Sequence, residues 1–167
     1  NAVGKPENAA EVIGDAPKLP LSMANLSVNS LIATSLALKG DRAGAKRLFD
    51  QILQQEPDHV YALRGRINLE IATGNAKAAI IDAQRLVSVV PRSPPDRLLL
   101  ARAFAAAGDR RQVDRTLWNA FHEIEGSFEL YEALRAHVER TDGPDAVPAI
   151  DEEFKQQRDV ALAREFI

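Results

Sequence analysis

Apolar residues recur three and four positions apart along most of this chain, which is the spacing of amphipathic helices. The pattern begins at about Asn25, and short breaks rich in glycine, proline and aspartate interrupt it. It predicts successive helices from about 25 to the break at Gly40, over 42–55, 59–73 and 76–89, from Pro94 to the break at Gly108, over 111–124, from about 130 to the break at 142–144, and over 145–165. No segment shows the strict alternation of a strand, so we expect an all-α chain.

The breaks between these helices follow a fixed period. Gly40, Gly74 and Gly108 are each 34 residues apart, and the turn-forming residues Asp41, Asn75 and Asp109 follow them, while Pro57 and Pro91 keep the same step. A constant period of this length indicates stacked repeats, in which each unit buries its apolar face on its neighbours.

The residues around each glycine complete a pattern. An apolar, a small and a bulky apolar residue precede it, and an alanine, a bulky residue and a closing proline follow, as in Ile32, Ala33, Leu36, Gly40, Ala45, Phe49 and Pro57. The third unit repeats it with Leu100, Ala101, Phe104, Gly108, Val113, Leu117 and Ala120, although Glu125 stands in place of the proline. This pattern resembles the tetratricopeptide repeat, whose length is also 34 residues.

The resemblance implies a right-handed α-solenoid of antiparallel helix hairpins, with about three to four repeats and a C-terminal capping helix. We expect an irregular lead-in over 1–24, which contacts the first helices through Val12, Ile13, Leu19 and Leu21 or is a partly disordered end. The repeat domain would then cover 25–167, with units at about 26–59, 60–93 and 94–127 and a degenerate unit at 128–167.

The second unit departs from the pattern, because Arg66 and Glu70 occupy positions where bulky apolar residues are expected. Either the helix is rotated, with Leu63, Ile67 and Ile71 forming the core stripe, or the two charges mark a polar site between hairpins. We favour the rotation, because burying charge is costly.

Composition narrows the possible functions. The formal net charge is −3, which argues against a general nucleic-acid binder, since such proteins carry a basic surface. The chain has no cysteine, which removes disulfides, thiolate catalysis and cysteine metal sites, and no apolar run approaches the roughly 20 residues of a membrane span. It starts at Asn1 without a methionine, which favours an excised piece or a processed form, and the compartment stays open between cytoplasm and periplasm.

No local motif indicates catalysis, a metal or a cofactor. His122 and Glu123 begin like a zinc-protease helix, but the second histidine is missing, so we expect His59, His122 and His137 to be structural or surface residues. Asp151, Glu152 and Glu153 are adjacent on a helix and therefore point in different directions, as a solvated face does.

In tetratricopeptide proteins the first helix of each hairpin lines a concave groove that holds partner peptides. By this resemblance the groove residues here are Tyr61, Arg64, Asn68, Leu98 and Arg102. The corresponding positions in the flanking units are Ser27, Ser30, Thr34, Glu132 and Ala136. Arg64 and Asn68 resemble part of the clamp that some members use for the terminal carboxylate of a peptide, to which Arg102 would add a second contact. A solvated helix face is the alternative.

We therefore expect a non-catalytic scaffold that binds a protein or peptide, without nucleic acid, membrane insertion, metal or cofactor. Two alternatives remain open. The chain is an accessory docking domain of a larger enzyme, secretion or envelope-polysaccharide assembly, or it forms a structural homodimer through Leu162, Phe166 and Ile167.

Overall fold

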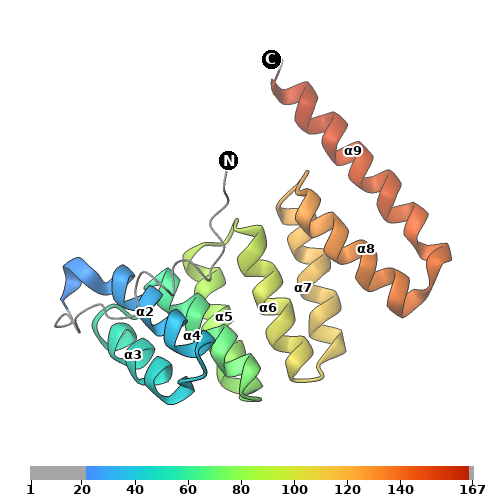
Figure 1. Cartoon of the computed structure of the whole chain (residues 1–167). Coiled ribbons are helices and arrows are strands. Elements are labelled where there is room, and N and C mark those ends of the chain that lie inside the picture. The colour runs from blue at the N-terminus through green and yellow to red at the C-terminus, as the bar shows by residue number, and fades with distance from the viewer. Residues whose placement is uncertain (1–21, 166–167) are drawn as a thin grey trace. The chain divides into compact units, whose positions relative to one another are not determined.

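The computed structural model describes residues 22–165, which form eight α-helices and two short 3-10 turns without a strand (Figure 1). The all-α prediction is therefore confirmed for this range. The elements are η1 (Met23–Asn25), α2 (Leu26–Leu38), α3 (Arg42–Gln55), α4 (Val60–Ala72), α5 (Ala76–Val89), α6 (Pro94–Ala106), α7 (Arg110–Glu123), α8 (Phe128–Asp142), η2 (Pro144–Ala146) and α9 (Val147–Glu165). The contacts predicted for Val12, Ile13, Leu19 and Leu21 lie outside the described residues.

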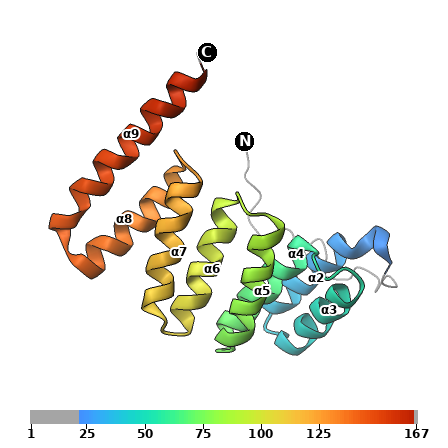
Figure 2. The same cartoon turned by 180° about the vertical axis from the view of Figure 1, so that it is seen from behind.

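The helices belong to two compact units that divide between Val89 and Val90. In the first unit α2 pairs with α3 and α4 pairs with α5, and α4 also contacts both α2 and α3. In the second unit α6 pairs with α7, and α8 contacts α6, α7 and α9 (Figure 2). Each unit is thus built from successive helix hairpins, as the repeat pattern predicts.

The equally spaced glycines end the first helix of each hairpin. Gly74 has a φ of 78°, which a residue with a Cβ adopts only under strain, and Gly40 and Gly108 share this left-handed conformation. The following amide then turns back, so that Asn75 N–H donates to the carbonyl of Glu70 at 2.8 Å. Asp41 and Asp109 cap the next helices, accepting from Gly44 N–H at 2.8 Å and Gln112 N–H at 3.1 Å.

The predicted core residues line the hairpin interiors. Ala33, Ala45 and Ala79 are fully buried, because small side chains let the paired helices approach closely. Successive hairpins of the first unit also pack tightly. A Cβ built on Gly65 of α4 would lie 2.3 Å from Cζ of Phe49 on α3, so the ring of Phe49 fills the space of a side chain that Gly65 lacks.

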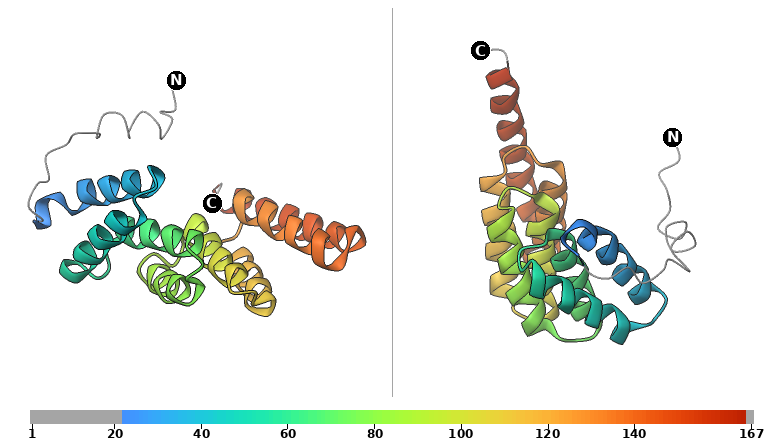
Figure 3. Two further views of the ribbon diagram at one scale, coloured as in Figure 1. Left: turned by 60° about the horizontal axis from the view of Figure 1, so that its bottom comes forward. Right: turned by 90° about the vertical axis from the view of Figure 1, so that its left-hand side faces the viewer.

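The last helix packs against α8 of the second unit (Figure 3). Gly143, with a φ of 94°, and Pro144 separate α8 from α9, and Val147, Ile150 and Phe154 are buried as expected. Gln157 secures the contact with α7, since its Oε1 accepts from Gly126 N–H at 3.1 Å and its Nε2 donates to the carbonyl of Phe121 at 3.4 Å. Glu152, Lys155 and Gln156 stay exposed on α9, which agrees with a capping helix.

Across residues 22–165 no helix combines the length and apolar character needed to cross a bilayer.

Candidate peptide-binding face

Three of the predicted groove residues lie on one face of α4, where Tyr61 and Asn68 are exposed and Arg64 is half-buried. Tyr61 is 58% exposed, and the guanidinium carbon of Arg64 lies 6.0 Å from the centre of its ring, at the limit of a cation–π contact. Asn68 is also exposed, and its Nδ2 donates to the carbonyl of Arg64 at 2.8 Å. A tyrosine, a cation and an amide therefore follow one another along the helix surface.

The neighbouring helix α2 supplies a less polar strip than predicted. Ser27 and Thr34 are exposed, whereas Ser30 is only 2% exposed and donates to the carbonyl of Leu26 at 2.9 Å. Ser30 is therefore a buried residue and not a groove residue.

His59 explains why Ser30 is buried. The ring of His59 is 7% exposed and caps α4, where Nδ1 accepts from Ala62 N–H at 3.2 Å. The Nε2 atom of the ring lies 3.3 Å from Oγ of Ser27. Ser30 Oγ lies 3.4 Å from Nδ1. His59 thus joins the start of α4 to α2 and is structural, as expected.

The other predicted groove positions belong to the second unit. On α6, Leu98 is half-buried and Arg102 is exposed, and on α8 both Glu132 and Ala136 are exposed. The structure thus brings Tyr61, Arg64 and Asn68 together on one helix, and places Leu98 and Arg102 on another helix of the second unit.

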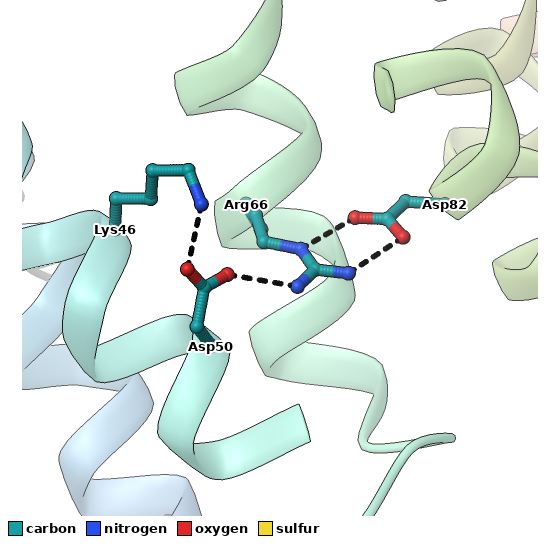
Figure 4. A network of polar contacts seen from close by, with 4 residues as sticks. All are labelled: Lys46, Asp50, Arg66 and Asp82. Atoms are coloured by element: carbon teal, nitrogen blue, oxygen red, sulfur yellow. Dashed lines mark hydrogen bonds and ion pairs between the residues drawn. The ribbon is translucent and has the colours of Figure 1, made fainter. Parts of the chain in front are cut away.

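A cluster of charged side chains joins the two hairpins of the first unit (Figure 4). Arg66 of α4 donates through Nε and Nη2 to the two carboxylate oxygens of Asp82 on α5, at 2.6 and 2.7 Å. Its Nη1 donates to Asp50 of α3 at 2.9 Å, and Lys46 donates to the other oxygen of Asp50 at 2.6 Å. We call these four residues together with Glu70 the interhairpin charge cluster.

This arrangement corrects the favoured interpretation of the second unit. Leu63 and Ile67 are fully buried as the rotated helix requires, but Ile71 is only half-buried and the helix does not turn its charges to solvent. Glu70 is 7% exposed, and the Arg66 side chain is 20% exposed. Two aspartates from neighbouring helices compensate Arg66, which is why a polar site between hairpins is possible at all.

The pKa values in the cluster follow from this geometry. Burial favours the neutral form of Glu70, and the nearby charge of Asp82 adds to this effect, which raises the pKa of Glu70 to about 7. Arg66 opposes the shift only partly because its nitrogens are committed to Asp82 and Asp50. One Glu70 oxygen, Oε2, is buried without a hydrogen-bond partner. Burial also raises the pKa of Asp50, but hydrogen bonds from Lys46 and Arg66 outweigh it, and the net pKa is lowered.

The second unit holds two further polar contacts and an aromatic cluster. His137 is 6% exposed and contacts Asp114 of α7, so it joins α7 to α8. Tyr131 stacks on Phe154 with ring centres 4.2 Å apart and donates to Asp151 at 2.9 Å. Burial and this hydrogen bond raise the pKa of Tyr131.

Trp118 and His122 lie on α7 of the second unit. Trp118 is half-buried beside Phe121 and His122 of its own helix, and exposed His122 pairs with Glu153 of α9 at 2.9 Å. Within residues 22–165 no three histidine or acidic side chains converge in a way that would hold a metal ion.

Sequence reasoning missed the partners of Arg66 and the capping role of His59. A signal for the first was present, because Asp50 and Asp82 stand 16 residues before and after Arg66. The dimer residues Leu162, Phe166 and Ile167 lie outside the side chains that the structure describes.

Comparison with known proteins agrees with a helical-repeat fold. No protein-family model matches the sequence, and no curated protein matches it. Among solved structures, MamA from Desulfovibrio magneticus RS-1, from residue 41 to its end, is similar with a TM-score of 0.66 and 16% identity, over 94% of this chain and 88% of that one. A double mutant of MamA RS-1 is similar with a TM-score of 0.63 and 17% identity, over 95% and 88%. A tetratricopeptide repeat protein from Parabacteroides merdae ATCC 43184 has a TM-score of 0.62 and 19% identity over 91% of this chain and 57% of its own length. The chain therefore has a tetratricopeptide-like fold of helical hairpins.

Proposed function

We propose that this chain is a non-catalytic scaffold that binds a protein or peptide partner on the exposed faces of the first helices of its hairpins. The observation that carries the proposal is the row of Tyr61, Arg64 and Asn68 on α4, beside the uncharged surface of α2. Tyrosine and arginine are enriched in protein interfaces, since each combines a large contact area with hydrogen-bonding groups.

The chemistry of this row indicates the kind of partner. Arg64 offers a guanidinium, which recognises carboxylates through charge-assisted hydrogen bonds, and the ring of Tyr61 offers an apolar surface beside it. Arg102 offers the same group on α6 of the second unit. A peptide that ends in a free carboxylate or carries acidic residues fits these groups better than a basic peptide.

The proposal is tested with the full chain and an array of peptides that carry free C-termini, each paired with its C-terminal amide. Peptides that bind are then titrated by fluorescence anisotropy. Because a charge-assisted hydrogen bond contributes about 1.5–3 kcal/mol, we expect Arg64→Ala and Arg102→Ala each to weaken binding by roughly 10- to 100-fold. Circular dichroism should show unchanged helicity in both variants.

Arg115→Ala is the matched control, because Arg115 is an exposed arginine on α7, outside the first helices of the hairpins. This variant should bind as tightly as the unchanged chain. Equal affinity of the Arg64→Ala, Arg102→Ala and Arg115→Ala variants, or a preference for peptide amides, would contradict a carboxylate-binding face.

A further inference from the structure

Glu70 is the least satisfied member of the interhairpin charge cluster. Its side chain is 7% exposed, and its Oε2 atom has no hydrogen-bond partner among the residues that the structure describes. An ionised carboxylate in such a place is costly, because burial removes the water that stabilises its charge and no donor replaces it. A neutral carboxyl group pays much less of this cost. The position therefore favours a bound proton on Glu70.

The charged groups that face Glu70 come from each charged helix packed against it. On α4 itself, Arg66 donates all three guanidinium nitrogens to Asp82 of α5 and Asp50 of α3. Lys46 of α3 pairs with the other oxygen of Asp50. The remaining helix in contact with α4, α2, contains no charged residue. The two cations of the cluster are thus already paired with two aspartates, and an ionised Glu70 is a third carboxylate beside them.

The cluster lies where the two hairpins of the first unit meet. The helix α4 pairs with α5 and packs on α3, and Arg66 connects all three helices. A negative charge on Glu70 adds repulsion with Asp82 and Asp50 at this junction. Opening the junction relieves the repulsion, because water then reaches the carboxylate. The cluster has no member in the second unit, which starts at Val90.

We propose that Glu70 is a proton switch for the junction between α3, α4 and α5. With the proton bound the junction stays closed, and loss of the proton lets it open locally while the second unit keeps its packing. Burial and the charge of Asp82 raise the pKa of Glu70 to about 7 from an ordinary 4.5. Opening therefore becomes easier as pH rises from about 4.5 to about 7, and changes little above. This inference does not depend on the proposed peptide binding, since it concerns the interior of the first unit.

Hydrogen exchange of the backbone amides tests the switch, with the full chain and its Glu70→Gln variant measured at the same pH values. Glutamine does not ionise, so the ratio of the two rates at each pH removes the intrinsic pH dependence of exchange. For amides of α3 and α4, this ratio should rise roughly ten- to a hundredfold between pH 5 and pH 8. For amides of α8 it should stay constant. A constant ratio for α4, or an equal rise for α4 and α8, would overturn the proposal.

Glu132→Gln is the matched control, because it makes the same change at an exposed glutamate of the second unit. Its α4 amides should exchange like those of the unchanged chain at every pH. A second measurement follows the proton directly, by NMR of the chain with ¹³C-labelled glutamate carboxyl groups. The resonance that is missing from Glu70→Gln should titrate near pH 7. Its titration below pH 5 would show that Glu70 holds no proton near neutrality, and the proposal would be wrong.

Discussion

At the scale of single residues, the interhairpin charge cluster shows how charges become tolerable inside a helical repeat. Arg66 stands at a position where the repeat pattern has an apolar side chain. It remains inside because all three of its guanidinium nitrogens donate hydrogen bonds to Asp82 or Asp50. Glu70 is left over. With Glu70 ionised the cluster carries two positive and three negative charges, a net charge of −1, and with Glu70 protonated it is neutral.

Glu70 should make stability depend on pH near neutrality. Its pKa is about 7 in the folded chain, against an ordinary value of 4.5 for glutamate, so the folded state binds more protons between these pH values. Unfolding free energy must therefore fall as pH rises from about 4.5 to about 7, by at most about 3 kcal/mol, and level off above. Urea denaturation at several pH values measures this slope.

Glu70→Gln should flatten the slope between pH 5.5 and 7.5 and stabilise the chain above pH 7. Glu132→Gln, at an exposed glutamate, is the control and should keep the original slope. The same pH dependence in both variants would mean that Glu70 is ionised throughout this range.

Arg66→Ala should be strongly destabilising. It leaves Asp82, whose side chain is 8% exposed, without its cation, which costs on the order of 3 kcal/mol for a largely buried pair. Arg85→Ala removes the exposed pair with Asp58, with side chains 45% and 61% exposed, and should change stability by less than about 1 kcal/mol. Similar losses in the two variants would show that the Arg66 contacts contribute no more than a surface ion pair.

At the scale of helices, the contact between hairpins depends on the shape of one position. Gly65 has no side chain, and the ring of fully buried Phe49 occupies that space. Unlike the glycines that end helices, Gly65 is needed for close approach and not for its backbone conformation, because it lies within α4.

Gly65→Ala should therefore lower the unfolding free energy by about 1–3 kcal/mol through overpacking, despite the higher helix propensity of alanine. Adding Phe49→Leu should recover part of the loss, because a smaller side chain makes room for the new methyl group. If Gly65→Ala is stabilising, as propensity alone predicts, the contact between Gly65 and Phe49 is looser than the structure indicates.

At the scale of the whole molecule, charge and repeat architecture point to the same class of partner. The net charge of −3 gives no general attraction for phosphate backbones, so the binding that we propose would depend on local groups such as Arg64. We expect random-sequence duplex DNA to show no mobility shift with the full chain at roughly physiological salt. Binding in the micromolar range under these conditions would require a basic surface that the composition does not predict.

Much of this fold was predictable from the sequence. The glycines, the prolines and the apolar spacing are local signals, since a left-handed turn or an amphipathic stripe is decided by a few adjacent residues, and the predicted helix ranges agree with the structure to within a few residues. The row of Tyr61, Arg64 and Asn68 was equally accessible, because positions three and four apart share a helix face.

The tertiary structure decided the contacts between residues on different helices. Three features depend on partners from another helix. Arg66 stays inside the fold, Ser30 is buried beside His59, and the ring of Phe49 packs against Gly65. A single helix pattern assigns a charged residue to solvent because burial alone is unfavourable, and only the packed neighbours show that two aspartates reverse this balance. The sequence by itself thus determined which segments are helices and where they turn, while packing determined which polar residues became interior.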